Sequence, residues 1–211
     1  MNRLAVVRHG KSTGNLDESM YTECEAAICL TPKGVKQIIQ AAHLIKPFFH
    51  PYGHGAYISA YCSKLFRAWH SARILLDTMG FQKVEPIQDG HLNERHYGEY
   101  LAGRLPDEHK RALDFAPNGG ESMRDIHARV VPWFQNTIMP LLAFNDVLLV
   151  THHNTSQALL GHLRGVRIEE ITEIDVLNGR PHVFQVDPLP ARQIREVEIP
   201  WHVPAEWSEI S

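Results

Sequence analysis

The chain has 211 residues, with 21 lysines and arginines against 24 aspartates and glutamates, and therefore a formal net charge of −3 at pH 7. Hydrophobic residues make up 44% and charged residues 21% of the sequence, which is typical of globular proteins and excludes a disordered or fibrous chain. Because basic residues are not in excess, neither nucleic acid nor a membrane is expected as a partner, and a homo-oligomer is left open. The length suits a single domain over residues 1–211.

The first half of the chain is expected to alternate strands with helices. Residues 4–7 are a short, continuous apolar run, which is typical of a strand buried on both faces. Thr31 and Pro32 predict a helix start after a polar loop. In chain order we expect a strand at 4–7, a loop at 11–30, a helix at 31–46, a strand at 56–62, a helix at 64–79 that ends at Gly80, and a short strand at 84–87.

The second half is expected to contain one long irregular crossover and then further alternating elements. Ser122 is a predicted helix N-cap, and Pro132 and Pro140 are expected to bend the helix that follows. The predicted elements are a crossover at 89–121 with a short helix near 107–115, a helix at 122–144, a strand at 146–150, a helix at 155–163, and strands at 182–186 and 194–199. This alternation predicts an α/β fold with a mainly parallel sheet.

Two of the predicted strands end in a histidine. His9 follows Arg8 at the end of the first strand, and His152 follows the strand at 146–150. Because the carboxyl ends of parallel strands form the ligand crevice of an open sheet, we expect the two histidines to meet there. Arg67, near the start of a helix, can reach the same edge. The forked donors of arginine fit phosphate oxygens, so these four residues predict an anion pocket.

This pocket has the residues that phosphoryl transfer requires. A neutral imidazole is a competent nucleophile toward phosphorus, and the neighbouring cations should lower the pKa of His9 and keep one ring nitrogen unprotonated. The same cations would stabilise charge on the transferring group. Glu94 is the candidate general acid, which protonates the leaving oxygen and then deprotonates water.

At this point the sequence resembles a known family. The chain is similar to the histidine phosphatase superfamily, and specifically to its phosphoglycerate mutase-like branch, over roughly residues 3–187. The segments that match in order are Arg8-His9-Gly10 with Ser12 and Asn15, Leu30-Thr31-Pro32-Lys33-Gly34, Ser63 to Ala68, Leu92 to Gly98, Gly120-Glu121-Ser122, His152 to Asn154, and Leu177 to Pro181. The resemblance implies a three-layer α/β sandwich, with helices on both sides of the central sheet, and no metal.

The resemblance also implies roles for individual residues. His9 is the residue that becomes phosphorylated, and Glu94 is the general acid and base. The residues expected to bind phosphate or substrate are Arg8, Arg67 and His152, assisted by Asn15 and Asn154, with Ser12, Tyr97, Lys110 and Arg111 as further substrate-binding candidates.

Departures from the family pattern bear on which reaction is catalysed. Mutases of the family carry two arginines where this chain has Lys110-Arg111, and the segment between Gly98 and Lys110 is shorter than theirs. His153 replaces the usual glycine after the second histidine. A more open pocket favours hydrolysis, because a mutase must protect its phosphohistidine from water. We therefore expect a phosphatase without a cofactor. The alternatives are a 2,3-bisphosphoglycerate-dependent mutase and a non-catalytic phosphate-binding protein.

Cysteine usage and the N-terminus indicate a cytoplasmic protein. Cys24, Cys29 and Cys62 are an odd number and suggest reduced thiols. The apolar run at the N-terminus is too short for a signal peptide, and no stretch is long enough to span a bilayer. His50 and His54 are expected on a surface loop rather than at a metal site, because proline and glycine interrupt any helix that could align them.

Overall fold

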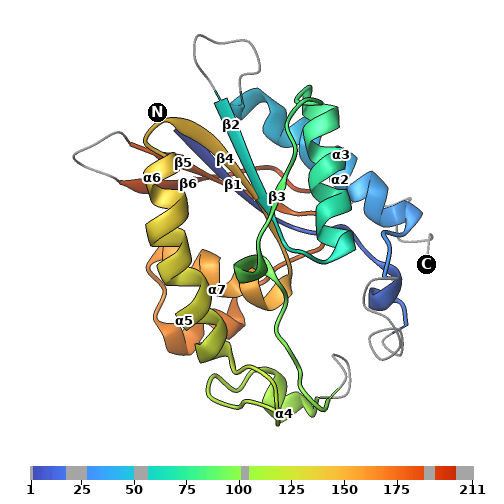
Figure 1. Ribbon diagram of the computed structural model, residues 1–211, viewed down its shortest axis with the longest axis vertical. Coiled ribbons are helices and arrows are strands. Elements are labelled where there is room, and N and C mark those ends of the chain that lie inside the picture. The colour runs from blue at the N-terminus through green and yellow to red at the C-terminus, as the bar shows by residue number, and fades with distance from the viewer. Residues whose placement is uncertain (1, 18–27, 50–56, 101–104, 188–192, 203–211) are drawn as a thin grey trace.

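The protein, described here as a computed structural model over residues 2–17, 28–49, 57–100, 105–187 and 193–202, is built on a central six-stranded sheet (Figure 1). The strands are β1 (Asn2–Arg8), β2 (Tyr57–Cys62), β3 (Ile87–Gln88), β4 (Asn145–Thr151), β5 (Pro181–Val186) and β6 (Ile194–Val197). Their order is β3-β2-β4-β1-β5-β6. The first four of these are parallel, whereas β5 and β6 run antiparallel to their neighbours. The prediction of a mainly parallel sheet is confirmed.

Helices cover both faces of this sheet. The α-helices are α2 (Pro32–Ile45), α3 (Phe66–Met79), α4 (Asp107–Lys110), α5 (Met123–Trp133), α6 (Met139–Leu141) and α7 (His153–Arg164). Short 3-10 turns lie at Thr13–Asn15, Lys46–Phe48, Gly90–Leu92 and Ile168–Glu173. In Figure 1, α2 and α3 lie on one side of the sheet and α5 and α7 on the other. This is the expected three-layer arrangement.

The alternation of side chains along β1 divides the core between the two layers. Leu4 and Val6 belong to the apolar cluster that contains α5 and α7, and Ala5 and Val7 to the cluster that contains α2 and α3. Successive side chains of a strand point to opposite faces, and all four are fully buried. The strand is therefore buried on both faces, as predicted.

Both predicted helix N-caps are present. The Thr31 hydroxyl accepts a hydrogen bond from the Gly34 amide at 3.0 Å, and Pro32 begins α2. Ser122 and Asp125 form a reciprocal pair, in which each side chain accepts from the other's backbone amide, at the start of α5. These bonds satisfy amides that have no partner within the helix, which is why the two helices begin at these positions.

The predicted helix over 122–144 is not continuous. After α5 the chain forms a π-helical turn at Phe134–Ile138 and then α6. The turn lies between Pro132 and Pro140, two residues without an amide proton, and the Met139 amide donates to the carbonyl of Phe134 in the wider π pattern. The two prolines thus change the helix type rather than only bending it.

The predicted short helix near 107–115 is present as α4, but it ends at Lys110, so its predicted extent is wrong. Tertiary contacts hold the following residues in another conformation. The His109 ring stacks on Phe115 with centroids 3.9 Å apart, and the Arg124 amide donates to the carbonyl of Leu113 at 3.0 Å. Other boundaries shift slightly: β3 lies at Ile87–Gln88 instead of 84–87, α3 begins at Phe66, α7 begins at His153, and β6 ends at Val197.

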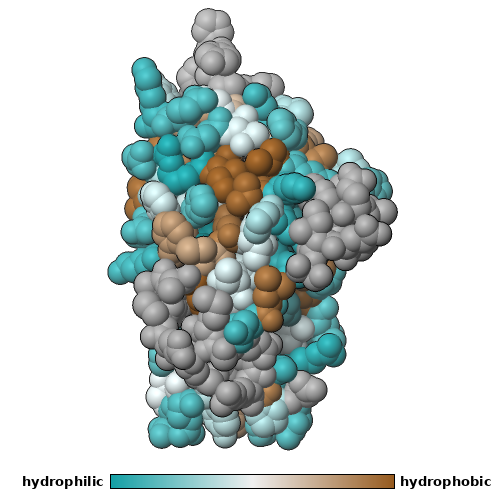
Figure 2. Space-filling model, turned by 90° about the vertical axis from the view of Figure 1, so that its right-hand side faces the viewer, coloured by the Kyte–Doolittle hydropathy of each residue, from teal (hydrophilic) through white to brown (hydrophobic). Residues whose placement is uncertain are grey.

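The surface on the side of α2 and α3 is mainly hydrophilic, with a hydrophobic patch near its middle (Figure 2). A shallow groove of about 330 Å³ lies along α2 and is lined by Lys36, Ile39, Gln40, His43 and Leu44. None of these residues is a predicted site residue. Among the described residues, no helix combines the length and apolarity needed to cross a membrane.

Candidate active site

The two histidines predicted to meet do lie together at the carboxyl edge of the sheet. Arg8 of β1 pairs with Thr151 of β4, and the His9 amide donates to the Thr151 carbonyl at 3.0 Å, so both strands end at the same level. The next residues along each strand are therefore neighbours. The ring centroids of His9 and His152 are 4.9 Å apart, and the rings meet edge to face.

Two arginines surround this histidine pair. Arg67 lies in the first turn of α3, and only 1% of its surface is exposed to solvent. Burial, followed by the charges of Arg67 and Arg8, holds the pKa of His9 well below its ordinary value. The pKa of His152 is lowered by burial and then by Arg67, His9 and Arg8. Both rings are therefore neutral at pH 7, in a pocket whose fixed charges are positive.

A hydrogen bond determines which nitrogen of His9 carries the proton. Nδ1 of His9 lies 2.8 Å from the carbonyl oxygen of Gly10. Because a carbonyl oxygen can only accept, Nδ1 must be protonated in the neutral ring, which leaves a lone pair on Nε2. The ring is thus prepared to act as a nucleophile through Nε2.

Gly10 is required for a close approach of two backbones. A Cβ atom at Gly10 would lie 2.3 Å from the carbonyl oxygen of Gly34, and one at Gly34 would lie 2.0 Å from the carbonyl oxygen of Lys11. The loop after β1 therefore crosses the first turn of α2 at a distance that only glycine allows. This crossing fixes the backbone that carries His9.

Ser12 and Asn15 lie beside the same loop. The Asn15 side-chain oxygen accepts from the amide and from the hydroxyl of Ser12, both at 3.0 Å. Asn178 donates from its side-chain nitrogen to the His9 carbonyl at 3.0 Å and also approaches the Asn15 oxygen at 3.4 Å. Asn178 was not predicted as a site residue, although it lies in a segment that matches the family.

Glu94 lies in the irregular segment after the 3-10 turn Gly90–Leu92, and its carboxylate contacts the first turn of α7. Its Oε1 accepts from the amide of Asn154 at 3.1 Å and from that of Arg95 at 2.9 Å. The Asn154 side chain donates to the hydroxyl of Tyr97 at 2.9 Å. Because Asn154 follows His152 by two positions, Glu94, Asn154 and Tyr97 are gathered at the edge that carries the histidine pair.

The basic pair Lys110-Arg111 lies on the surface at the end of α4. Arg111 is 74% exposed in its side chain and forms an ion pair with Glu173 at 3.6 Å. Lys110 is also exposed. The Arg111 guanidinium is thus directed into an exposed ion pair rather than into the buried cluster.

Two further histidines, His153 and His96, directly precede the site residues Asn154 and Tyr97 in the chain. Nδ1 of His153 is 3.4 Å from Nη1 of Arg8 and 3.4 Å from the Val176 carbonyl, to which Arg8 itself donates at 2.8 Å. Burial and the charge of Arg8 lower the pKa of His153, and Glu94 opposes this shift. His96 instead places its Nδ1 2.9 Å from the Gly119 carbonyl.

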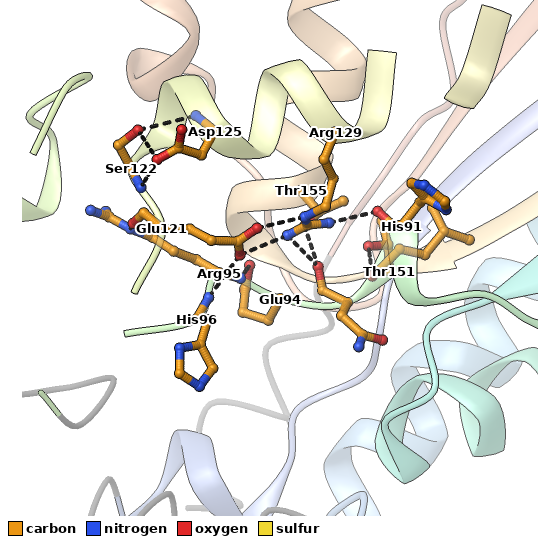
Figure 3. A network of polar contacts seen from close by, with 12 residues as sticks. His91, Glu94, Arg95, His96, Glu121, Ser122, Asp125, Arg129, Thr151 and Thr155 are labelled. Atoms are coloured by element: carbon orange, nitrogen blue, oxygen red, sulfur yellow. Dashed lines mark hydrogen bonds and ion pairs between the residues drawn. The ribbon is translucent and has the colours of Figure 1, made fainter. Parts of the chain in front are cut away.

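The segment that carries Glu94 is held by residues that sequence analysis missed. The hydroxyls of Thr151 and Thr155 donate to the carbonyls of Leu92 and Asn93, both at 2.6 Å, and Arg129 reaches the same segment from α5 (Figure 3). Neither the residue types nor their spacing in the sequence indicate these contacts.

Some predictions concern residues outside the described ranges, namely those on Cys24, His50 and His54. Cys29 and Cys62 are free thiols. Burial raises the pKa of Cys62 to about 12, so this thiol stays protonated at neutral pH.

Comparisons with known proteins identify the family of this chain. The family model of the histidine phosphatase superfamily (branch 1) matches residues 4–189. The 2,3-bisphosphoglycerate-dependent phosphoglycerate mutase of Dichelobacter nodosus is 30% identical in sequence. The alignment covers 89% of this chain and 88% of the mutase. The enzyme of the same name from Bartonella tribocorum is 33% identical, and the alignment covers 88% of this chain and 92% of that enzyme.

Solved structures show the same fold at lower identity. A mycobacterial glucosyl-3-phosphoglycerate phosphatase superposes with a TM-score of 0.70 at 20% identity, over 94% of this chain and 97% of that one. The α-ribazole phosphatase of Shigella flexneri superposes with a TM-score of 0.71 at 20% identity, over 93% of this chain and 95% of that one.

Proposed function

This chain is an enzyme of the histidine phosphatase superfamily, and from its site we propose that it hydrolyses a small phosphomonoester through a phosphohistidine on His9. The observation that carries the proposal is the buried His9 ring, protonated on Nδ1 by its bond to Gly10, beside Arg67 and Arg8. A nucleophile and an anion pocket are thereby combined at one strand end. Neither a metal nor an organic cofactor is needed for this chemistry.

In the first step Nε2 of His9 attacks phosphorus, and the bond from phosphorus to the ester oxygen breaks. The negative charge on the phosphoryl oxygens faces Arg8, Arg67 and His152, whose fixed positions lower the cost of the transition state. The leaving oxygen takes a proton from Glu94 and departs as an alcohol.

In the second step Glu94, now ionised, removes a proton from water. The resulting hydroxide attacks the phosphohistidine, inorganic phosphate leaves, and the Nε2 lone pair returns to His9. Glu94 ends the cycle protonated, so the same carboxyl group serves as acid and then as base. Ser12, Asn15, Tyr97 and Asn154 would complete the binding of the phosphate or of the alcohol portion.

A second candidate function is a 2,3-bisphosphoglycerate-dependent mutase, which the names of the curated relatives favour. A mutase must bind a substrate with a second anionic group and keep the bisphosphate in place between steps. Arg111 is engaged in an exposed ion pair with Glu173, which does not favour such a second anion site. A non-catalytic phosphate-binding protein is less well supported, because binding alone would not require Glu94.

The two reactions differ in their phosphorus-containing product. With 3-phosphoglycerate and catalytic 2,3-bisphosphoglycerate, phosphorus NMR should show inorganic phosphate as the main product. A panel of small phosphomonoesters should likewise release phosphate. Accumulation of 2-phosphoglycerate faster than inorganic phosphate would replace the proposal with the mutase, and no turnover in either assay would favour the binding protein. A His9→Asn protein is the control for contaminating enzymes.

A further inference from the structure

The guanidinium of Arg129, on α5, contacts the backbone just before Glu94. Its Nη1 donates to the carbonyl of His91 at 2.7 Å, and its Nη2 approaches that of Asn93 at 3.3 Å. The same guanidinium forms a bidentate pair with Glu121, at 2.7 Å from Nε and 3.0 Å from Nη2 (Figure 3). A single side chain therefore connects three points around the loop.

Glu121 contacts the loop on the other side of Glu94. Its Oε2 accepts from the His96 amide at 3.0 Å, and its backbone carbonyl accepts from Nε of Arg95 at 2.8 Å. Burial raises the pKa of Glu121, but the hydrogen bonds from Arg129 and the His96 amide outweigh this effect and hold the pKa below its ordinary value. Glu121 is thus ionised, and the Arg129–Glu121 pair contacts the backbone both before and after Glu94.

The loop needs these contacts because it has little regular structure of its own. The 3-10 turn Gly90–Leu92 ends just before it, and residues 93–97 belong to neither a helix nor a strand. Its buried carbonyls and amides must therefore find partners in side chains. Arginine suits this role because its planar fork presents donors in fixed directions, which lysine cannot do.

We propose that Arg129, acting through Glu121 and the carbonyls of His91 and Asn93, is a positioning residue that holds the carboxyl group of Glu94 where it protonates the leaving oxygen. This inference rests on the proposed function, which makes Glu94 the general acid. Arg129 itself does not touch the substrate. Its effect on formation of the phosphohistidine should therefore depend on whether the leaving oxygen needs a proton, because a displacement of about 1 Å is enough to slow severely a step that needs one.

The test compares p-nitrophenyl phosphate with phenyl phosphate, which have similar shapes but different leaving groups. p-Nitrophenolate is a weak base and departs without a proton, whereas phenolate, with a conjugate-acid pKa of about 10 like that of tyrosine, needs one. In Arg129→Lys and in Glu121→Gln, kcat/KM for phenyl phosphate should fall by about tenfold to a hundredfold, and kcat/KM for p-nitrophenyl phosphate by less than about threefold. Because kcat/KM covers only the steps up to formation of the phosphohistidine, the later role of Glu94 as the base toward water does not enter this comparison.

Arg164 provides a matched control. It forms a bidentate pair with Glu196, at 2.7 Å for both contacts, and the two side chains are 27% and 32% exposed, against 21% and 24% for Arg129 and Glu121. Arg164→Lys should leave the ratio of the two kcat/KM values unchanged. An equal loss on both substrates in Arg129→Lys and in Glu121→Gln, with the ratio as in the control, would overturn the positioning role.

Glu94→Gln separates failure of the inference from failure of the proposed function. In this variant kcat/KM should fall by about 10²-fold or more for phenyl phosphate and by much less for p-nitrophenyl phosphate. If Glu94→Gln changes the ratio and Arg129→Lys does not, only the positioning role is wrong. If Glu94→Gln leaves the ratio unchanged, the general-acid assignment and the inference both fail.

Discussion

Replacement of His9 by asparagine is expected to lower kcat for phosphomonoester hydrolysis by about 10³-fold or more. The variant removes the only nucleophile that the proposed mechanism uses and keeps a polar side chain of smaller size in the pocket. Arg8, Arg67 and His152 remain, so inorganic phosphate should still bind. The measurements are steady-state kinetics with p-nitrophenyl phosphate and calorimetric titration with phosphate.

His43 is the matched control for this substitution, because it is an exposed histidine on α2. His43→Asn should retain the wild-type kcat within about twofold, as expected of surface substitutions. A His9→Asn protein that hydrolyses p-nitrophenyl phosphate at a rate near the wild-type rate would exclude His9 as the nucleophile.

Replacement of Arg67 by methionine is expected to lower kcat/KM by about 10²-fold to 10³-fold, the effect of removing one preorganised charge from a transition-state site. The pH dependence should also change. After burial, Arg67 is the strongest influence that lowers the pKa of His9, so its removal should raise that pKa toward the ordinary value. His9 would then become protonated and inactive at a higher pH, and the acid limb of the kcat/KM profile should move upward.

Arg67→Lys tests whether charge or geometry causes each effect. Lysine keeps the positive charge but lacks the fork, so this variant should lose rate while its acid limb stays near that of the wild type. Ionisation of the substrate is common to all three proteins, and the difference between their profiles therefore reports on the enzyme. An acid limb that is the same in Arg67→Met as in the wild type would mean that His9 is not the group that titrates.

The parts of the fold that depend on local sequence were predictable. Thr31 and Ser122 cap their helices because the hydroxyl bond to a nearby amide is a local interaction. The extent of α4 was not predictable, since the stacking of His109 on Phe115 and the contact of Leu113 with α5 are tertiary contacts. The π turn before Pro140 was missed for a similar reason, because proline signals an interruption but not its form.

The candidate site divides in the same way. His9 and His152 could be placed together from the sequence, because two parallel strands of one sheet deliver their carboxyl ends to the same edge. Asn178 and Arg129 could not be assigned, since both act on backbone carbonyls of segments distant in the sequence. A side chain that bonds to a backbone carbonyl has no characteristic partner residue, so spacing and residue type carry no signal of it.

The most direct test of the account is to trap the phosphorylated enzyme. Rapid acid-free quenching during turnover of a ³²P-labelled phosphomonoester should yield a protein label that is stable in alkali, labile in acid, and located on His9 by peptide mass spectrometry. The label should then be lost to water as inorganic phosphate at a rate no slower than kcat. Turnover without any labelled protein, or a label on a residue other than His9, would contradict a phosphohistidine mechanism at this site.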